Sequence, residues 1–80
     1  MGEKKRPMAV IDLAGTGRRV YELREKAGLS VAQLQQQMGL ASPQAIYRWQ
    51  RGETLPTIDN LVLLAEILGV SLEEILVINR

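Results

Sequence analysis

The chain has 80 residues, with ten lysines and arginines, nine acidic residues, and neither histidine nor cysteine. This length suits one small domain rather than two. The missing cysteines exclude a disulfide framework and a thiolate metal site, and the missing histidines remove the commonest general base and metal ligand. The remaining carboxylates, lysines, tyrosines and hydroxyls form no constellation typical of catalysis. We therefore expect no enzyme, no cofactor and no metal.

The sequence also indicates no membrane segment. The longest unbroken apolar run, residues 61–65, is far shorter than the ~20 residues that a membrane span needs. The first six residues include three basic ones but no apolar stretch long enough for a signal peptide. We therefore expect a soluble, cytoplasmic protein. Because 80 residues suit one small domain, we also expect no separate domain that senses a small-molecule effector.

The charges are distributed unevenly along the chain. Residues 1–55 carry nine basic and five acidic side chains, whereas residues 56–80 carry one basic and four acidic ones. A net charge of +1 thus conceals a basic first part and an acidic last part. The asymmetry is a weak indication of an anionic partner for the first part, because ordinary solvated charge also explains it.

In chain order, the pattern predicts a short extended arm followed by five helices. The arm covers residues 8–13, and the helices cover residues 17–27, 31–38, 43–51, 58–68 and 72–78. A hydroxyl residue that can cap the first turn precedes each helix, at Thr16, Ser30, Ser42, Thr57 and Ser71. A glycine that can end a helix follows the first four, at Gly28, Gly39, Gly52 and Gly69.

These elements predict an all-α fold, a compact five-helix bundle preceded by an extended N-terminal arm. We divide the chain into an arm over residues 1–15 and a domain over residues 16–79. The broadest apolar stripe lies on helix 58–68, which should be the most buried. Near the end of the chain, Val77 and Ile78 either extend the core or form a small dimer contact.

The helix over residues 43–51 has two chemically different faces. Four polar side chains share one face, at spacings of three, four and seven residues: Gln44, Tyr47, Arg48 and Arg51. Ile46 and Trp49 fall on the opposite side and anchor the helix in the core. No acidic residue occurs between residues 28 and 52. Such a face suits duplex DNA, because arginine can pair with guanine and glutamine with adenine in the major groove.

Several short runs occur in a characteristic order around this helix. They are Leu23-Arg24-Glu25-Lys26-Ala27-Gly28-Leu29-Ser30, Met38-Gly39, Ile46-Tyr47-Arg48-Trp49-Gln50-Arg51-Gly52, Pro56-Thr57, Asn60-Leu61, Leu64-Ala65, Leu68-Gly69-Val70-Ser71 and Glu74-Ile75-Leu76. The pattern resembles the lambda-repressor-like, Cro/XRE-type helix-turn-helix family over about two-thirds of the chain. The resemblance implies a five-helix domain that binds double-stranded DNA, with helix 43–51 as the recognition helix and a central helix-turn-helix.

The resemblance also implies roles for individual residues. Expected base contacts are Gln44, Ala45, Tyr47 and Arg48. Expected phosphate contacts are Ser30, Gln33, Ser42, Arg51, Thr54 and Arg18, with Arg19 as the alternative to Arg18. Ile46 and Trp49 are the expected core anchors of the recognition helix. The expected partners are duplex DNA and a second copy of the chain on a pseudo-palindromic site.

The sequence departs from the family pattern at three places. Val31 stands where many members have a phosphate-contacting glutamine, so Ser30 or Gln33 would take over that contact. Gln50 replaces a common acidic residue and removes a potential ion pair. The turn over residues 39–42 is one residue longer than the common form.

The leading hypothesis is a sequence-specific transcriptional regulator, and specifically a repressor. The alternative is an antitoxin or another protein-interaction module with the same fold. Arg48 and Arg51 could also be merely solvated, or could pair with Glu53 or with an acid of helix 58–68. Tyr47 could be a packing residue. The basic residues at 4–6 are either a frayed tail or an arm for the minor groove.

Overall fold

The first helix, α1, spans Leu13–Lys26 in the computed structural model, which describes residues 10–79 of the chain. It begins four residues before the expected start, because Asp12 rather than Thr16 caps it: the Asp12 Oδ1 accepts a hydrogen bond of 2.9 Å from the Gly15 amide. Thr16 lies inside the helix and is only 1% exposed. The prediction of Thr16 as the cap was therefore wrong, because the helix already begins at Leu13 and the Asp12 carboxylate caps it.

The second helix, α2, spans Val31–Met38 as predicted. Ser30 caps it as expected and forms a capping box with Gln33, in which each side chain bonds the backbone amide of the other residue. Gly39 ends the helix with a φ of 70°, a left-handed conformation that glycine adopts without strain. A short turn then leads to the third helix and completes a helix-turn-helix.

The third helix, α3, spans Gln44–Gln50 and is one residue shorter at each end than predicted. Pro43 occupies the N-cap position with a helical backbone, and no side chain caps the helix there. Ser42, the predicted cap, accepts only a long bond of 3.4 Å from the Gln44 amide. Because Pro43 takes the N-cap position, Ser42 lies one residue before it, and the prediction of Ser42 as the cap was wrong.

The fourth helix, α4, spans Ile58–Leu68 as predicted and is capped by Thr57. The fifth, α5, covers only Leu72–Ile75, although the predicted cap Ser71 is present and forms a capping box with Glu74. After α5 the backbone becomes extended, so the predicted helix to residue 78 was wrong at its end.

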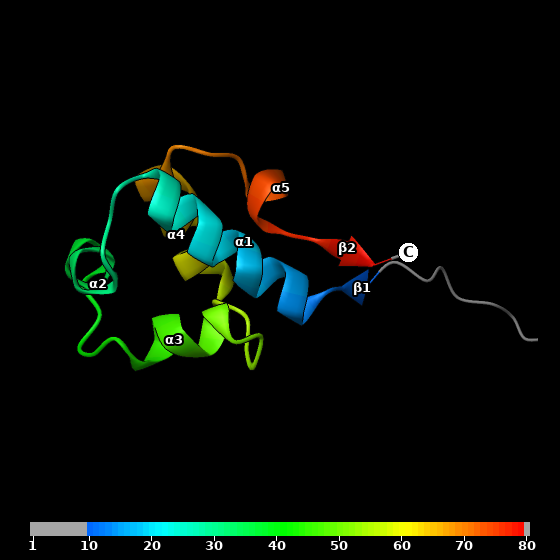
Figure 1. Ribbon diagram of the computed structural model, residues 1–80, viewed down its shortest axis with the longest axis horizontal. Coiled ribbons are helices and arrows are strands. Elements are labelled where there is room, and N and C mark those ends of the chain that lie inside the picture. Colours follow the sequence, from blue (N-terminus) through cyan, green and yellow to red (C-terminus); the bar gives the residue numbers. More distant parts are fainter. Residues whose placement is uncertain (1–9, 80) are drawn as a thin grey trace, which may run out of the picture.

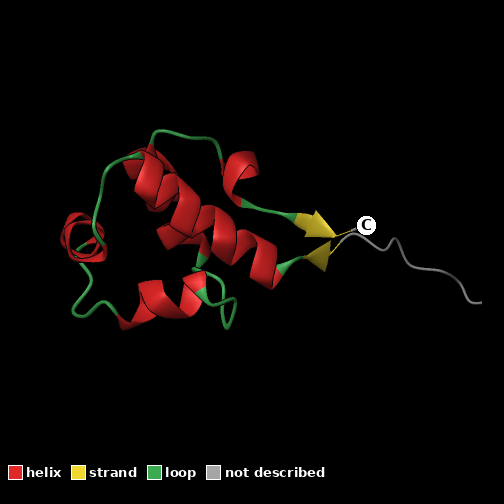
Figure 2. Ribbon diagram, viewed as in Figure 1, coloured by secondary structure: helices red, strands yellow, loops and turns green. Residues whose placement is uncertain are grey.

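The last described residues form strand β2 (Ile78–Asn79), which pairs antiparallel with β1 (Val10–Ile11). Figure 2 shows these two strands side by side at one end of the molecule. The Asp12 amide extends the pairing by donating to the Val77 carbonyl over 2.8 Å. The extended arm predicted over residues 8–13 is thus confirmed at residues 10–11 and wrong at Leu13, which begins α1. Residues 8–9 lie outside the described part, and the domain division at residue 16 stays a prediction.

The helices pack around one core, which confirms the predicted all-α five-helix fold; only the strand pair was not expected. Helix α1 crosses the molecule with α3 along one side and α5 on the other, while α4 contacts α2 and α5 (Figure 1). The fully buried core side chains are Val20, Leu34, Ile46, Leu64 and Ile75. Within residues 10–79, no helix is both long and apolar enough to cross a membrane.

Candidate nucleic-acid interface

Helix α3 exposes one polar face and buries the other. Ile46 and Trp49 belong to the core, as predicted, and fix the rotation of the helix about its own axis. The polar stripe, defined as Gln44, Tyr47, Arg48 and Arg51, consists of exposed residues. The helix therefore presents an amide, a phenol and two guanidinium groups on one outward surface.

The remaining candidate base contact, Ala45, differs from the polar stripe. It is half-buried and packs against the core, so only part of its methyl group is accessible. Tyr47 is 40% exposed and thus combines packing with an accessible ring. Among the candidate base contacts, the stripe residues have the larger accessible surface.

The candidate phosphate contacts on α2 are already engaged in local bonds. The Ser30 Oγ accepts from the Gln33 amide over 3.0 Å, and the Gln33 Oε1 accepts from the Ser30 amide over 2.8 Å. The Ser30 hydroxyl and the Gln33 side-chain amide keep donor hydrogens for an outside acceptor. Val31, which stands where many family members have a phosphate-contacting glutamine, packs against the core.

At the C-terminal end of the polar stripe, Arg51 pairs with Glu53. The Arg51 Nε donates to the Glu53 Oε2 over 2.6 Å, and both side chains are about half exposed. The hydrogen bond from Arg51 holds the pKa of the Glu53 carboxyl below its ordinary value, and the charge of Arg48 lowers it further. Of the alternatives for Arg51, the pairing with Glu53 is the one present.

A surface hollow of about 310 Å³ lies between α1 and the end of α3. We call it the Arg18–Arg51 hollow; its lining residues are Ala14, Arg18, Tyr21, Gln50 and Arg51. It brings together two candidate phosphate contacts that are 33 residues apart in the chain. Arg19, the alternative to Arg18, instead donates to the Glu74 carbonyl over 2.7 Å and links α1 to α5.

Two glycines bring the backbones together beside this hollow. A Cβ atom on Gly17 would overlap the Trp49 carbonyl oxygen and lie 2.8 Å from that of Gln50. A Cβ atom on Gly52 would lie 2.9 Å from the Ala14 Cα. Because no side chain separates α1 from the end of α3, the backbone positions of Arg18 and Arg51 are fixed relative to each other.

No role was predicted for Arg24, which also joins α1 to α3. Only 7% of it is exposed, and its Nε donates to the Gln50 Oε1 over 3.0 Å. Its Nη1 donates to the Leu29 carbonyl over 2.7 Å, and its guanidinium carbon lies 5.2 Å from the centre of the Tyr21 ring. The sequence signal for this contact was Gln50, which stands where many family members have an acidic residue. Its amide oxygen, like a carboxylate, can accept a hydrogen bond from arginine.

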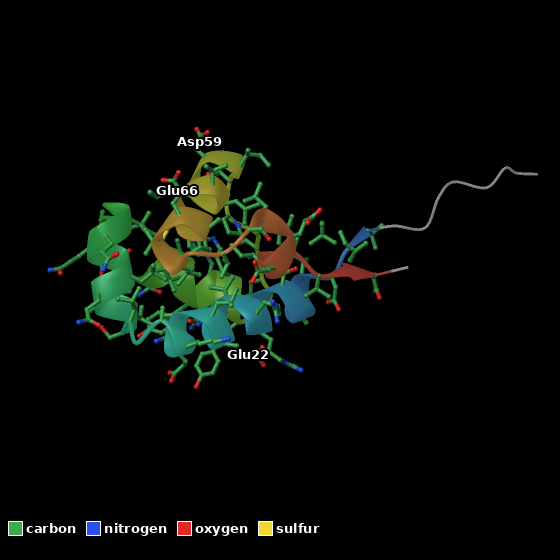
Figure 3. The ribbon with its side chains drawn as sticks, turned by 90° about the horizontal axis from the view of Figure 1, so that it is seen from above. Glu22, Asp59 and Glu66 are labelled. Carbon is green, nitrogen blue, oxygen red and sulfur yellow. The ribbon has the colours of Figure 1, made fainter. Side chains whose placement is uncertain are left out.

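Three acidic side chains project outward from helices other than α2 and α3. Figure 3 shows Asp59 and Glu66 projecting outward from α4 and Glu22 projecting outward from α1. Residues 28–52, which contain α2 and α3, have no acid at all. Glu53 is therefore the acid closest in sequence to the polar stripe, and it pairs with Arg51 of that stripe. Thr54, a candidate phosphate contact, follows directly after Glu53 and is exposed.

Comparison with solved structures found several similar helix-turn-helix proteins. The restriction-modification controller protein C.AhdI from Aeromonas hydrophila is 31% identical, with a TM-score of 0.72 over 80% of this chain and 96% of that chain. An HTH_3 family transcriptional regulator from Vibrio cholerae is 28% identical, with a TM-score of 0.69 over 80% of this chain and 35% of that chain. The DNA-binding domain of BldD, at 22% identity, shares the fold with a TM-score of 0.71 over 82% and 94% of the two chains.

The sequence comparisons identify the family. A search of curated protein sequences gave no significant match. The model of the HTH_3 helix-turn-helix family matches residues 20–75, which include α2, α3, α4 and α5 completely. The chain therefore belongs to the HTH_3 family of Cro/C1-type helix-turn-helix proteins and is a DNA-binding transcriptional regulator.

Proposed function

We propose that the protein is a sequence-specific repressor that reads the major groove of double-stranded DNA with α3. The polar stripe carries this proposal, because its four side chains are exposed on a helix whose other face is locked in the core. An α-helix fits the major groove of B-DNA, where base edges present a distinct pattern of donors and acceptors. Occupation of a site that overlaps a promoter excludes polymerase sterically, so repression requires no activity beyond binding.

In this proposal the first half of α3, together with Arg48 directly after it, contacts the bases. Arg48 can donate two hydrogen bonds to the O6 and N7 atoms of guanine, and Gln44 can pair with the N6 and N7 atoms of adenine. Tyr47 supplies a ring and a hydroxyl between them, and the half-buried methyl of Ala45 suits an apolar contact such as a thymine methyl.

Phosphate contacts on either side of α3 would fix the register of the protein on the duplex. The proposed contacts are Ser30, Gln33, Ser42, Arg51, Thr54 and Arg18. All six are exposed, and those of α2 keep free donor hydrogens at the N-terminal end of a helix, which favours a negative charge. These contacts should make binding depend strongly on salt.

We also propose that two copies bind together on a pseudo-palindromic site. Ile58 and Val62 support this, because they lie one turn apart on α4 and are 73% and 45% exposed. Sedimentation should show a dimer for the unchanged protein. Ile58→Glu should weaken the dimer. An acidic residue in the first turn is compatible with the helix, so the variant should still fold. An unchanged dimer would exclude this face of α4.

Selection from a random duplex pool tests the proposal. The bound fraction should converge on one motif, and affinity for it should fall steeply between low and moderate salt. Failure to enrich any motif, with a salt-independent affinity, would contradict the proposal. Tight capture of a protein with no binding to any duplex would instead support the protein-interaction alternative.

A further inference from the structure

We propose that the Arg18–Arg51 hollow seats one phosphodiester of duplex DNA and that Glu53 competes with this phosphate for the Arg51 side chain. The inference rests on the proposed function, because it names an anion site beside the recognition helix. It adds a role for Glu53, which the sequence offered only as a possible ion-pair partner of the arginines: this residue limits affinity.

The chemistry of the hollow suits a phosphate. Two of its five lining residues are arginines and none is acidic. Arginine binds phosphate through planar, charge-assisted hydrogen bonds. Gln50 and Tyr21 also line the hollow, but the Gln50 oxygen is occupied by Arg24. The side-chain amide hydrogens of Gln50 therefore remain as donors toward an anion.

The geometry places this hollow next to the base-reading surface. Arg51 belongs both to the polar stripe and to the hollow, so one phosphate bound there would lie beside the duplex that α3 contacts. The backbone contacts at Gly17 and Gly52 hold α1 against the end of α3. Arg18 and Arg51 thus approach an anion from two elements whose spacing is set before DNA arrives.

Glu53 is the obstacle to this contact in the free protein. Its Oε2 accepts from the Arg51 Nε over 2.6 Å, and its Oε1 lies 3.5 Å from the Arg51 Nη2. The same edge of the guanidinium would serve a phosphate in a two-bond arrangement. The backbone amide of Glu53 donates to the Arg48 carbonyl over 2.9 Å, which keeps its side chain close to the stripe.

Competition has a definite consequence for binding. The phosphate must displace a carboxylate that already neutralises Arg51, so the protein loses affinity for any duplex and keeps its preference among sequences. An exposed pair of this kind contributes little to the fold. Its removal should therefore change DNA binding much more than folding.

The test compares Glu53→Gln with Glu66→Gln, which removes the same charge from the outward face of α4. Titration of the selected duplex and of an unrelated duplex should show that Glu53→Gln binds both about 3-fold to 10-fold more tightly at low salt, with a gain that shrinks as salt rises. Glu66→Gln should change binding less than 2-fold. Equal gains in the two variants would show that net charge alone acts and would overturn the competition.

A second comparison addresses the shared phosphate. Arg18→Gln and Arg51→Gln should each weaken binding to both duplexes, and the double variant should lose less than the product of the two losses, because both arginines hold one phosphate. Strictly multiplicative losses, or no loss for Arg18→Gln, would overturn the shared site. Either result with retained sequence preference leaves major-groove reading by α3 standing, although no loss for Arg18→Gln also removes Arg18 from the proposed phosphate contacts. Absence of binding to every duplex contradicts both proposals.

Discussion

The Nε of Arg24 on α1 donates a 3.0 Å hydrogen bond to the Oε1 of Gln50, the last residue of α3. Within residues 10–79, every buried side-chain nitrogen and oxygen has a hydrogen-bond partner, including those of Arg24. This bond therefore satisfies a buried charged donor and fixes the C-terminal end of α3 against α1 at the same time.

The bond predicts opposite effects for two substitutions at one position. Gln50→Ala leaves the buried Nε without its acceptor and should lower the free energy of unfolding by roughly 1–3 kcal/mol. Gln50→Glu keeps an acceptor and adds a charge-assisted bond, so its stability should equal or exceed that of the unchanged protein. Urea unfolding measures both, and an unchanged free energy for Gln50→Ala would refute the role of this contact.

Gly17 should be intolerant of the smallest side chain. Alanine normally stabilises a helix interior relative to glycine by ~1 kcal/mol. Here its Cβ would overlap the Trp49 carbonyl oxygen, so we expect Gly17→Ala to cost roughly 3 kcal/mol through overpacking. Gly28→Ala is the control: no atom lies within 4 Å of its Cβ, and only the positive φ opposes it. Thermal unfolding should rank Gly17→Ala well below Gly28→Ala; the reverse order would contradict the close contact.

The buried hydroxyl of Thr16 should hold the C-terminal segment in place. Its Oγ1 accepts a 2.9 Å bond from the Val77 amide, 61 residues away in the chain. Thr16→Val preserves the shape but removes the acceptor, which should cost roughly 1–3 kcal/mol. Thr16→Ser keeps the oxygen and serves as the control. Amide exchange of Val77 should become faster in Thr16→Val alone; unchanged protection would exclude this bond as the anchor.

Local signals were sufficient for the middle helices. The capping box of Ser30 with Gln33 and the Thr57 cap mark the starts of α2 and α4, and glycines mark their ends, so both ranges could be predicted. The opposed faces of α3 also followed from helical spacing alone. In these segments, the residues that cap a helix, end it and form its apolar face are all close together in the sequence.

Long-range contacts explain what could not be predicted. Thr16 has the sequence features of a helix cap, yet its hydroxyl bonds Val77 from inside α1. The apolar residues after Ile75 continue a helical pattern, but pairing with β1 makes them extended. The Arg18–Arg51 hollow likewise depends on the Gly17 contact between two helices. Neither the spacing of residues along the chain nor their type predicts which distant residues come into contact.

The two arginines of the polar stripe should differ in their effect on specificity. Arg51→Ala should weaken binding to all duplexes by a similar factor, because its proposed partner is a phosphate. Affinity titrations on the selected duplex and on single base-pair substitutions of it measure this, with thermal unfolding as the control for folding. A loss confined to one base pair would instead place Arg51 among the base contacts.

The most direct test of major-groove reading by α3 is the same titration with Arg48→Ala. We predict a loss of ~1–3 kcal/mol on the selected duplex and loss of discrimination at one base pair, with unchanged folding. Affinity and discrimination equal to those of the unchanged protein on every duplex would contradict the assignment of this face of α3 to the bases.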